Sequence, residues 1–555
     1  MTTMPFNQYR PFPTVQLPDR TWPNGRLAKA PIWCAVDLRD GNQALIEPMG
    51  VEKKLQMFNL LVKIGFKEIE VGFPASSEIE FTFVRTLIEE NRIPDDVTIQ
   101  VLTQSREELI QRTFEALKGV PRAIVHLYNS TSELQRRVVF CQSEEGIIQI
   151  ALSGARLIKK LAEKQPKTKW TFEYSPESFT GTEVKFACEI CNQVLDIWKP
   201  TLENKAIINL PATVEMSTPN KYADAIEWMG RHLSHRDSIV LSLHTHNDRG
   251  CAVAATELGL LAGADRVEGT LFGNGERTGN ADLVTLALNL MTQGIDPKVD
   301  LSDLPGAVRI AEECTRIEVH PRHPYAGLLA LTAFSGSHQD AINKGTRAME
   351  ISNSPIFEVP YLAFNPAHVG REYRPVRVNS QSGKGGVAYI MRDVYGVELP
   401  RPLLVDFATF VQKAAEETGG ELLPERVRQL FEEVYVNVAH PIELIDHYSV
   451  PGKVKGGRVL EATIKINGDS RFIAGDGNGE LNAFANALAT SCNIEVSLLD
   501  YQERSIGGGS DAKAIAYVAI AVPGREAVWG VGINTDIPTA SLLALASAVN
   551  RSRRT

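Results

Sequence analysis

The sequence of 555 residues is 43% hydrophobic and 23% charged, which are the proportions of a folded globular protein, and its length predicts about three or four domains. The 58 Lys and Arg residues against 67 Asp and Glu residues give a net charge of −9, and no basic cluster is interleaved with aromatics, so we expect no nucleic-acid partner. No apolar run approaches the ~18 residues of a membrane span and the N-terminus lacks a signal pattern, so we expect a cytoplasmic protein with no membrane partner.

Residues 1–30 are predicted to form an N-terminal arm, because they contain several prolines and little hydrophobic periodicity. From residue 31, short β-rich runs alternate with longer amphipathic stretches that are typical of helices. The eight β-rich runs cover residues 32–39, 68–74, 98–104, 123–129, 169–176, 206–214, 238–247 and 266–273. Eight β/α units predict an α/β fold of the (β/α)8 TIM-barrel type over residues 31–305. A doubly wound sheet is the alternative, but it would more often have about five or six strands and a glycine-rich first turn.

The β/α alternation ends near residue 305, and a helical connector region is expected over residues 306–438. The last part, residues 439–555, is β-rich and internally duplicated. Residues 462–490 and 515–550 each contain two predicted strands, a Gly-x-Gly turn and a helix rich in Ala and Leu. Such a repeat predicts a pseudo-symmetric α+β domain, which would serve either dimerisation or ligand sensing.

Most of the eight β-rich runs end in polar residues. In a TIM barrel, the C-terminal ends of the strands build the active site. The polar residues at these ends are Arg39, Asp40, Gln104, His126, Ser175, Glu177, Thr213, His244, His246, Glu276 and Asn280. A single polar strand end is usually only a turn signal, so the prediction of a site depends on their convergence.

Three of these residues have the chemistry of metal ligands. His244 and His246 are two positions apart on one predicted strand, so their imidazoles share a face. Asp40 follows the first strand, which neighbours the last strands across the barrel mouth. A carboxylate and two imidazoles leave coordination positions open for substrate and water, as a catalytic divalent metal requires. Two hydrogen-bonded histidines without a metal are the alternative.

Five segments carry a resemblance to a known family: DLRDGNQ (37–43), HTHND (244–248), GNGERTGNADL (273–283), VNSQSGKGGVAYI (378–390) and GGGSDAKAIAYV (507–518). The first three resemble the Claisen-condensing, metal-dependent barrel family, which includes the 2-isopropylmalate, homocitrate and citramalate synthases and the HMG-CoA lyases. The last two narrow the resemblance to 2-isopropylmalate synthases of the long bacterial type. Asn42 departs from the wider family, where many members have Glu in RDGEQ, and RDGNQ is typical of this synthase type.

The resemblance implies a pyruvate carboxyltransferase-like catalytic barrel that condenses acetyl-CoA with 3-methyl-2-oxobutanoate and hydrolyses the thioester to 2-isopropylmalate and CoA. This acyl transfer is the first committed step of leucine biosynthesis and is inhibited by leucine. The resemblance also implies a divalent metal, with Mg²⁺ the first choice and Mn²⁺ or Zn²⁺ as alternatives, and a homodimer.

Other activities on the same barrel stay open as alternatives. Citramalate or homocitrate synthase would use another 2-oxo acid, and one methylene in an apolar pocket contributes only ~1–3 kcal/mol of discrimination. A lyase would be a barrel alone, so the duplicated tail argues against it. A non-catalytic metabolite sensor would not need the polar residues at the ends of the barrel strands.

By resemblance, the metal ligands are Asp40, His244 and His246, with Asn280 contributing directly or through water. Arg39 is suited to the alkoxide that develops on the keto oxygen. The residues implied to bind substrate are Arg39, Leu102, His126, Ser175, Pro211, Thr213, Gly279 and Asn280, with Leu102 against the isopropyl group. His338 is the leading candidate for the base that removes an acetyl methyl proton, and Tyr373 and Glu177 are expected nearby. A solvated histidine is the alternative for His338.

End-product inhibition requires a leucine site, and the duplicated domain is the one module without a catalytic role. We expect Gly507, Gly508 and Gly509 to bring backbone N–H groups to the leucine carboxylate. Asp511 would hold the ammonium group, and the small Ala512 would leave room for the side chain. The alternative is an ordinary turn in a domain that only dimerises.

Overall fold

The computed structural model describes residues 12–332, 335–371, 373, 383–418, 422–452, 457–507, 512–522 and 527–553. The chain divides into two compact units. The first comprises Met1–Ala330 and Phe364–Glu372, and the second comprises Leu331–Ala363 and Tyr373–Thr555. Each unit is described by itself.

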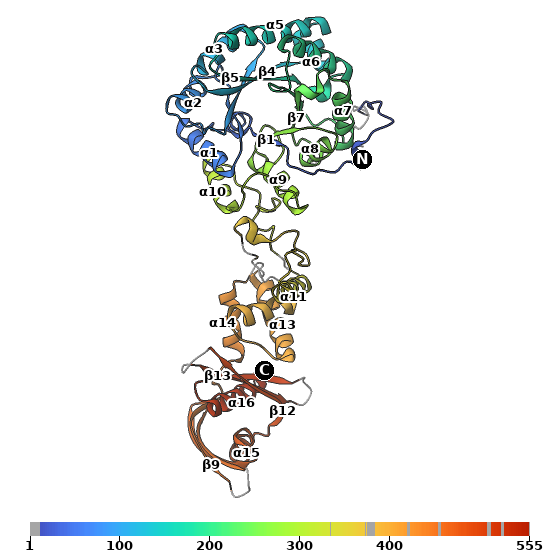
Figure 1. Cartoon of the computed structure of the whole chain (residues 1–555). Coiled ribbons are helices and arrows are strands. Elements are labelled where there is room, and N and C mark those ends of the chain that lie inside the picture. Colours follow the sequence, from blue (N-terminus) through green and yellow to red (C-terminus); the bar gives the residue numbers. More distant parts are fainter. Residues whose placement is uncertain are drawn as a thin grey trace, which may run out of the picture. The chain divides into compact units, whose positions relative to one another are not determined.

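A closed barrel of eight parallel strands forms the centre of the first unit (Figure 1). The strands are β1 (Ile32–Ala35), β2 (Glu68–Gly72), β3 (Thr98–Gln104), β4 (Arg122–Ser130), β5 (Lys169–Glu177), β6 (Ala206–Ala212), β7 (Ile239–Thr245) and β8 (Arg266–Gly269). The pairing of β1 with β8, from Ile32 opposite Arg266 to Ala35 opposite Gly269, closes the ring. The predicted TIM barrel is therefore confirmed, and each predicted β-rich run overlaps one of its strands.

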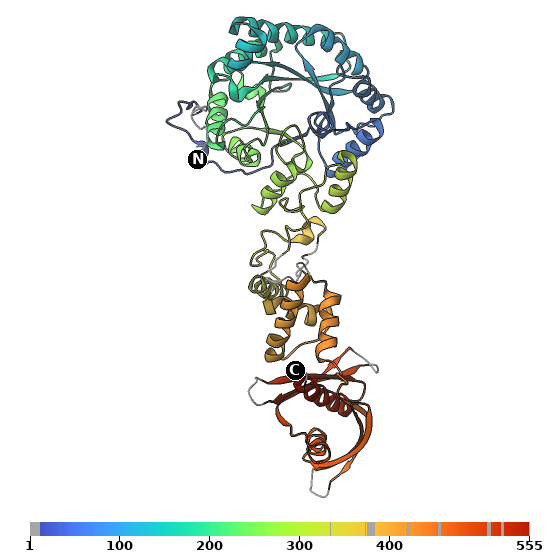
Figure 2. The same cartoon turned by 180° about the vertical axis from the view of Figure 1, so that it is seen from behind.

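Helices surround the strands in both views of the barrel (Figure 1, Figure 2). They are α1 (Val51–Ile64), α2 (Glu78–Glu89), α3 (Glu107–Ala116), α4 (Glu133–Gln135), α5 (Glu144–Glu163), α6 (Val184–Trp198), α7 (Pro219–His232), α8 (Ala252–Leu261), α9 (Leu283–Thr292) and α10 (Leu304–Thr315). Local sequence sets several of their ends. The side chains of Ser77, Ser143 and Asp282 accept backbone N–H groups at the starts of α2, α5 and α9.

The N-terminal arm is tied to the outer face of α7. Arg20 donates to Asp224 at 2.7 Å. Glu227, which is 5% exposed, accepts the backbone N–H groups of Thr21 at 2.9 Å and of Trp22 at 3.0 Å. Carboxylates on a barrel helix therefore hold the described part of the arm.

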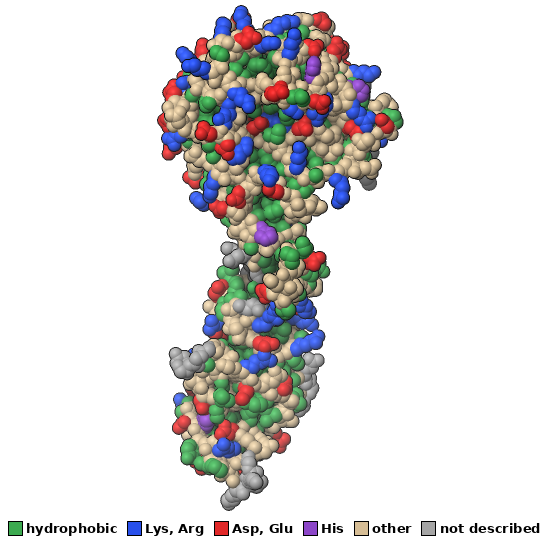
Figure 3. Space-filling model, in the orientation of Figure 1, with side chains coloured by type: hydrophobic (Ala, Val, Ile, Leu, Met, Phe, Trp, Pro, Cys, Tyr) green, Lys and Arg blue, Asp and Glu red, His purple; other side chains and the backbone are tan. Residues whose placement is uncertain are grey.

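The second unit begins with a helical region that contains α11 (Gly336–Ser352), α12 (Gly383–Tyr389), α13 (Arg401–Thr418) and α14 (Pro424–Tyr435). Phe407 of α13 packs edge-on against Phe431 and Tyr435 of α14, and all three are buried. Among the described residues, no helix combines the length and the hydropathy needed to cross a bilayer. Basic and acidic side chains are interspersed on the face that Figure 3 shows.

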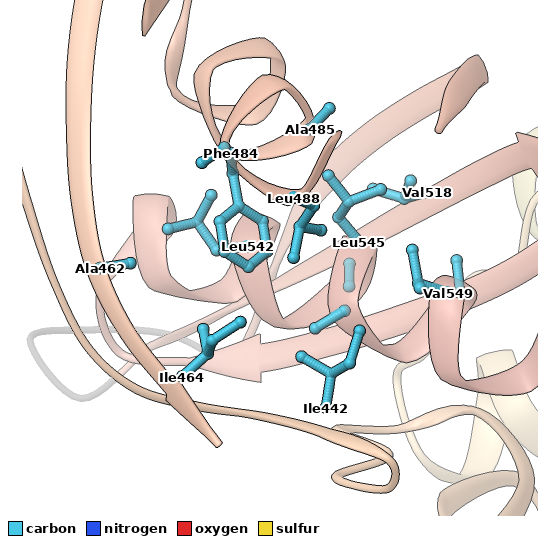
Figure 4. Packing of buried hydrophobic residues seen from close by; sticks show 14 of the residues in the cluster. Ile442, Ala462, Ile464, Phe484, Ala485, Leu488, Val518, Leu542, Leu545 and Val549 are labelled. Atoms are coloured by element: carbon cyan, nitrogen blue, oxygen red, sulfur yellow. The ribbon is translucent and has the colours of Figure 1, made fainter. Parts of the chain in front are cut away.

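The C-terminal part is a duplicated α+β fold, as predicted, with two antiparallel sheets of order β11-β10-β9 and β12-β13-β14. The first repeat contains β9 (Ile442–Pro451), β10 (Arg458–Ile466), β11 (Asp469–Gly477) and α15 (Glu480–Cys492). The second repeat contains β12 (Ser497–Ile506), β13 (Lys513–Ala521), β14 (Val528–Asn534) and α16 (Ile537–Arg553). Each repeat thus has three strands, one more than predicted. Phe484 and Leu488 of α15 meet Leu542 and Leu545 of α16 in one shared core (Figure 4).

The prediction of Gly-x-Gly turns in the two repeats is wrong. Gly475 and Gly477 lie within β11, and Gly530 and Gly532 lie within β14. A Cβ on Gly532 would lie 1.9 Å from the backbone oxygen of Ala540, so the glycines instead let the helices approach their sheets.

Candidate active site

The C-terminal ends of β1 and β7 bring Asp40, His244 and His246 together. Asp40 lies on the π-helical turn η3 (Asp37–Gly41) that follows β1, and the histidines lie at the end of β7, on the same face because they are two residues apart. Asp40 Oδ2 is 3.3 Å from His244 Nε2 and 3.4 Å from His246 Nε2. All three side chains are buried, and their ligand atoms lie within 4.8 Å of one another, as a metal site requires.

The predicted fourth ligand, Asn280, lies beside this set. Its backbone pairs with that of His246 in an isolated β-bridge. The side-chain Nδ2 donates to the backbone oxygen of Asn274 at 3.0 Å, and the buried Oδ1 has no hydrogen-bond partner among the described residues. An unsatisfied buried oxygen costs about 1–3 kcal/mol, and a cation would satisfy it. Two imidazoles, a carboxylate and an amide oxygen fit a divalent ion.

The charges around these ligands set their protonation. Burial alone would raise the pKa of Asp40, but the Arg39 guanidinium, 2.7 Å away, and the two histidines hold that pKa well below its usual range. Burial would lower the pKa of His244, but hydrogen bonds to Asp40 and Glu268 raise it to about 9. Burial and the charge of His244 lower the pKa of His246 to about 4. Metal binding requires both imidazoles to be neutral at the nitrogen that faces the ion.

A second group of possible ligands, Glu70, His126 and Glu268, is also buried in the barrel. Here the amide Nε2 of Gln100 already occupies the centre, donating to Glu70 Oε2 and Glu268 Oε1 at 2.7 Å each. Arg266 is fully buried and donates to Glu268 Oε1 at 2.9 Å. Glu70, Gln100, Arg266 and Glu268 therefore form a hydrogen-bonded network of charged and polar side chains.

This network holds the side chains around the predicted metal ligands in place. Glu268 Oε2 lies 2.7 Å from His244 Nδ1, so the other ring nitrogen of His244 faces Asp40. Glu70 pairs with Arg39 and so holds the guanidinium beside Asp40. Our prediction from the sequence missed Glu268 and Glu70, although a glutamate within an apolar strand run was the available signal.

Several predicted substrate residues also meet at the barrel mouth. His126 Nε2 lies 2.7 Å from Ser175 Oγ, and Asn209 Nδ2 donates to the same oxygen at 3.0 Å. Leu102 is 7% exposed and lies opposite His126 in the strand register. Pro211 lies opposite His244 in the pairing of β6 with β7.

The remaining predicted barrel residues lie in the loops after the strands. Thr213 Oγ1 accepts the backbone N–H of Ser178 at 3.0 Å, next to Glu177 at the end of β5. The Gly279 oxygen accepts the N–H of Asn247 at 3.0 Å, and its φ of +95° favours glycine.

The predicted residues His338 and Tyr373 belong to the second unit. His338 lies on α11, where its ring stacks on Tyr361 with centroids 3.9 Å apart. Burial raises the pKa of Tyr373 to about 12, and its buried hydroxyl has no hydrogen-bond partner among the described residues.

Of the predicted effector residues, Gly507 follows β12 and Ala512 precedes β13, while Gly508, Gly509 and Asp511 lie outside the described residues. A cavity of about 490 Å³ opens elsewhere in this domain, and neither Gly507 nor Ala512 lines it. Its lining is Asn478, Gly479, Glu480, Leu481, Asn482, Leu498, Leu499, Asp500, Tyr501, Ile537, Pro538 and Ser541.

Three family models match the chain. They are HMGL-like over residues 30–310, "alpha-isopropylmalate synthase, post-catalytic domain-like" over 329–392, and "LeuA allosteric (dimerisation) domain" over 421–553. The matches follow one another along the chain, from the barrel to the duplicated domain.

Curated relatives match the whole chain. A 2-isopropylmalate synthase of Parafrankia sp. is 56% identical over 557 residues, covering 99% of this chain and 98% of the relative. Those of Rhodospirillum rubrum and Pseudomonas syringae pv. tomato are 55% and 54% identical, over 98% and 100% of this chain and 98% of each relative. With such identity along nearly the full length of both chains, the chain belongs to the 2-isopropylmalate synthase family.

Proposed function

We propose that the protein condenses acetyl-CoA with 3-methyl-2-oxobutanoate and hydrolyses the thioester, releasing 2-isopropylmalate and CoA. The observation that carries this proposal is the buried set of Asp40, His244 and His246, with Arg39 bonded to Asp40 at the mouth of the barrel. The names of the full-length relatives, which are 2-isopropylmalate synthases, support this choice of product.

Asp40, His244 and His246 would hold a divalent ion, with Asn280 contributing directly or through water. Mg²⁺ is our first choice, and Mn²⁺ and Zn²⁺ are the alternatives. When bound, such an ion polarises the 2-oxo carbonyl as a Lewis acid. Arg39, held by Glu70 and Asp40, adds a fixed positive charge for the alkoxide that develops on the same oxygen.

Ser175 and His126 are our proposed contacts for the carboxylate of the 2-oxo acid. The two hydrogens of the Gln100 amide go to Glu70 and Glu268, and His126 Nε2 lies 2.7 Å from Ser175 Oγ. Asn209 Nδ2 donates to the same Ser175 oxygen at 3.0 Å. Leu102, Pro211, Thr213 and Gly279 complete the proposed 2-oxo acid site.

The proton of the acetyl methyl group must go to a base, because this carbon acid is very weak. His338 is our leading candidate, and Glu177 and Tyr373 are the other two. Exchange of the methyl protons with solvent separates the three candidates.

Leucine would act through the duplicated domain, for which the matching family model gives an allosteric and dimerisation role. The cavity of about 490 Å³ lies at the N-termini of α15 and α16, where free N–H groups favour a carboxylate. Glu480 and Asp500 would hold the ammonium group, and Leu481 would contact the side chain. The loop at 507–512, our sequence-based candidate, is the second proposed site. We also propose a homodimer.

The proposed reaction is tested by following CoA release with a thiol reagent. We expect fast release with 3-methyl-2-oxobutanoate and slow release with pyruvate or 2-oxoglutarate. A preference for pyruvate would indicate a citramalate synthase, and a preference for 2-oxoglutarate a homocitrate synthase. No release with any 2-oxo acid would contradict the proposal.

A further inference from the structure

The two histidines of the metal set differ in how their outer ring nitrogens are held. Both direct Nε2 toward Asp40. His244 Nδ1 lies 2.7 Å from Glu268, whereas His246 Nδ1 is buried and has no hydrogen-bond partner among the described residues. A histidine that binds a metal through one nitrogen almost always donates the other N–H to a carboxylate, a carbonyl or a water. A partner for His246 Nδ1 is therefore expected.

A small cavity lies next to His246. Its volume is about 10 Å³, and a space of about 10–15 Å³ holds one water molecule. Its walls comprise Thr180, Ala212, Glu215, Met216, Ser217, Pro219, Tyr222, Thr245, His246 and Ala255.

Glu215 brings a charged acceptor to this cavity. Its side chain is buried, and Oε2 accepts the backbone N–H groups of Arg249 at 2.5 Å and Cys251 at 3.4 Å. Its own N–H donates to Asp248 at 2.8 Å. These bonds hold the carboxylate in place, while the other oxygen, Oε1, is buried without a partner among the described residues. Glu215 and His246 therefore line one cavity, and each has one buried polar atom, Oε1 and Nδ1 respectively, without a partner among the described residues.

We propose that one water molecule fills this cavity, accepts the Nδ1–H of His246 and donates to Glu215 Oε1, so that Glu215 is a positioning residue for the second histidine of the metal set. The water connects His246 to a carboxylate, as direct contact connects His244 to Glu268. With the proton held on Nδ1, the Nε2 lone pair of His246 faces Asp40. This inference rests on the metal site proposed above.

The test measures Mn²⁺ binding to the full-length, metal-stripped protein, with free Mn²⁺ followed by electron paramagnetic resonance. Glu215→Gln keeps the size of the side chain and an oxygen for the Arg249 and Cys251 amides, but removes the charge. We expect about tenfold weaker binding, the lower end of the usual range for such partners, because a water transmits the effect. The matched control is Glu227→Gln, a buried glutamate on α7 that also accepts two backbone N–H groups, and it should bind Mn²⁺ like the wild type.

A second variant separates the water from the loop contacts of Glu215. Ala255 of α8 lines the cavity and is 3% exposed, so Ala255→Val fills the space and leaves Glu215 untouched. We expect a similar loss of Mn²⁺ affinity, and a double variant no weaker than either single one, because both changes remove the same bridge. Wild-type affinity in Ala255→Val, or additive losses in the double variant, would overturn the proposal.

A high-resolution crystal structure of the wild-type protein gives an independent test. We expect one water within ~3 Å of both His246 Nδ1 and Glu215 Oε1. An empty cavity would overturn the bridge and leave the metal site standing. If the wild-type protein binds no Mn²⁺, the proposed metal site fails and the positioning role fails with it.

Discussion

Replacing Arg39 with Gln should impair both catalysis and folding, by separate and measurable amounts. The Arg39 side chain is 10% exposed, and those of its partners Glu70 and Asp40 are 0% and 5% exposed. Removing one partner from a buried ion pair costs about 3–5 kcal/mol. Because Gln100 still donates to Glu70, we expect a loss at the lower end of this range, about 3 kcal/mol of the free energy of unfolding. Such a loss lowers the unfolding midpoint of the barrel by about 6 °C.

The loss of stability should also depend on pH. In the wild-type protein, burial alone would raise the pKa of Glu70, but Arg39 lowers it. The ionised Glu70 therefore stabilises the fold at neutral pH, and this contribution is lost as pH falls through its folded-state pKa. Without Arg39, burial raises that pKa, the folded state takes up a proton, and the stability penalty shrinks as pH falls. The difference from the wild type should be larger at pH 8 than at pH 5.

The assay is thermal unfolding of the full-length protein at both pH values, with chelator present so that metal binding does not contribute. CoA release at saturating substrate gives kcat, which should fall about 10²–10³-fold because one donor to the developing alkoxide is lost. Arg137→Gln, an exposed arginine beside Glu133, should leave both measurements unchanged. Identical pH dependence in Arg39→Gln and the wild type, or an unchanged kcat, would refute the reasoning.

Three further predictions address the metal, the base and the effector. Chelator should abolish CoA release and Mg²⁺ or Mn²⁺ should restore it, while His246→Ala should lose several orders of magnitude in activity and keep its unfolding midpoint; near-normal turnover without metal would contradict the ligand assignment. His338→Ala should slow exchange of the acetyl methyl protons with deuterium when an unreactive 2-oxo acid analogue fills the site, and unchanged exchange would move the role to Glu177 or Tyr373. Leu498→Trp, which fills the cavity at α15 and α16, should abolish leucine inhibition and preserve turnover. If Ala512→Val alone removes the inhibition, the loop at 507–512 is the effector site.

The eight barrel strands and the three metal ligands could be predicted from the sequence, because both depend on local patterns. Each barrel strand is a short β-rich run that its own residues specify, and the order of the runs dictates a closed parallel sheet. His244 and His246 share a face because side chains alternate along a strand, and Asp40 joins them because parallel strands end at the same rim. The two repeats of the C-terminal domain could also be predicted, because each is a local pattern of strands followed by a helix.

Only the tertiary structure decided how these ligands are supported, because those contacts join residues that no sequence spacing relates. Glu268 bonds to His244 across neighbouring strands, and Glu215 and His246 line one cavity. In the sequence, the glycines of β11 and β14 resemble turn residues. In the structure they leave room for α15 and α16 to pack against these strands. The cavity at the starts of α15 and α16 likewise exists only when both repeats close on one core. Local periodicity specifies elements, whereas the partners of a buried polar atom depend on which elements pack together.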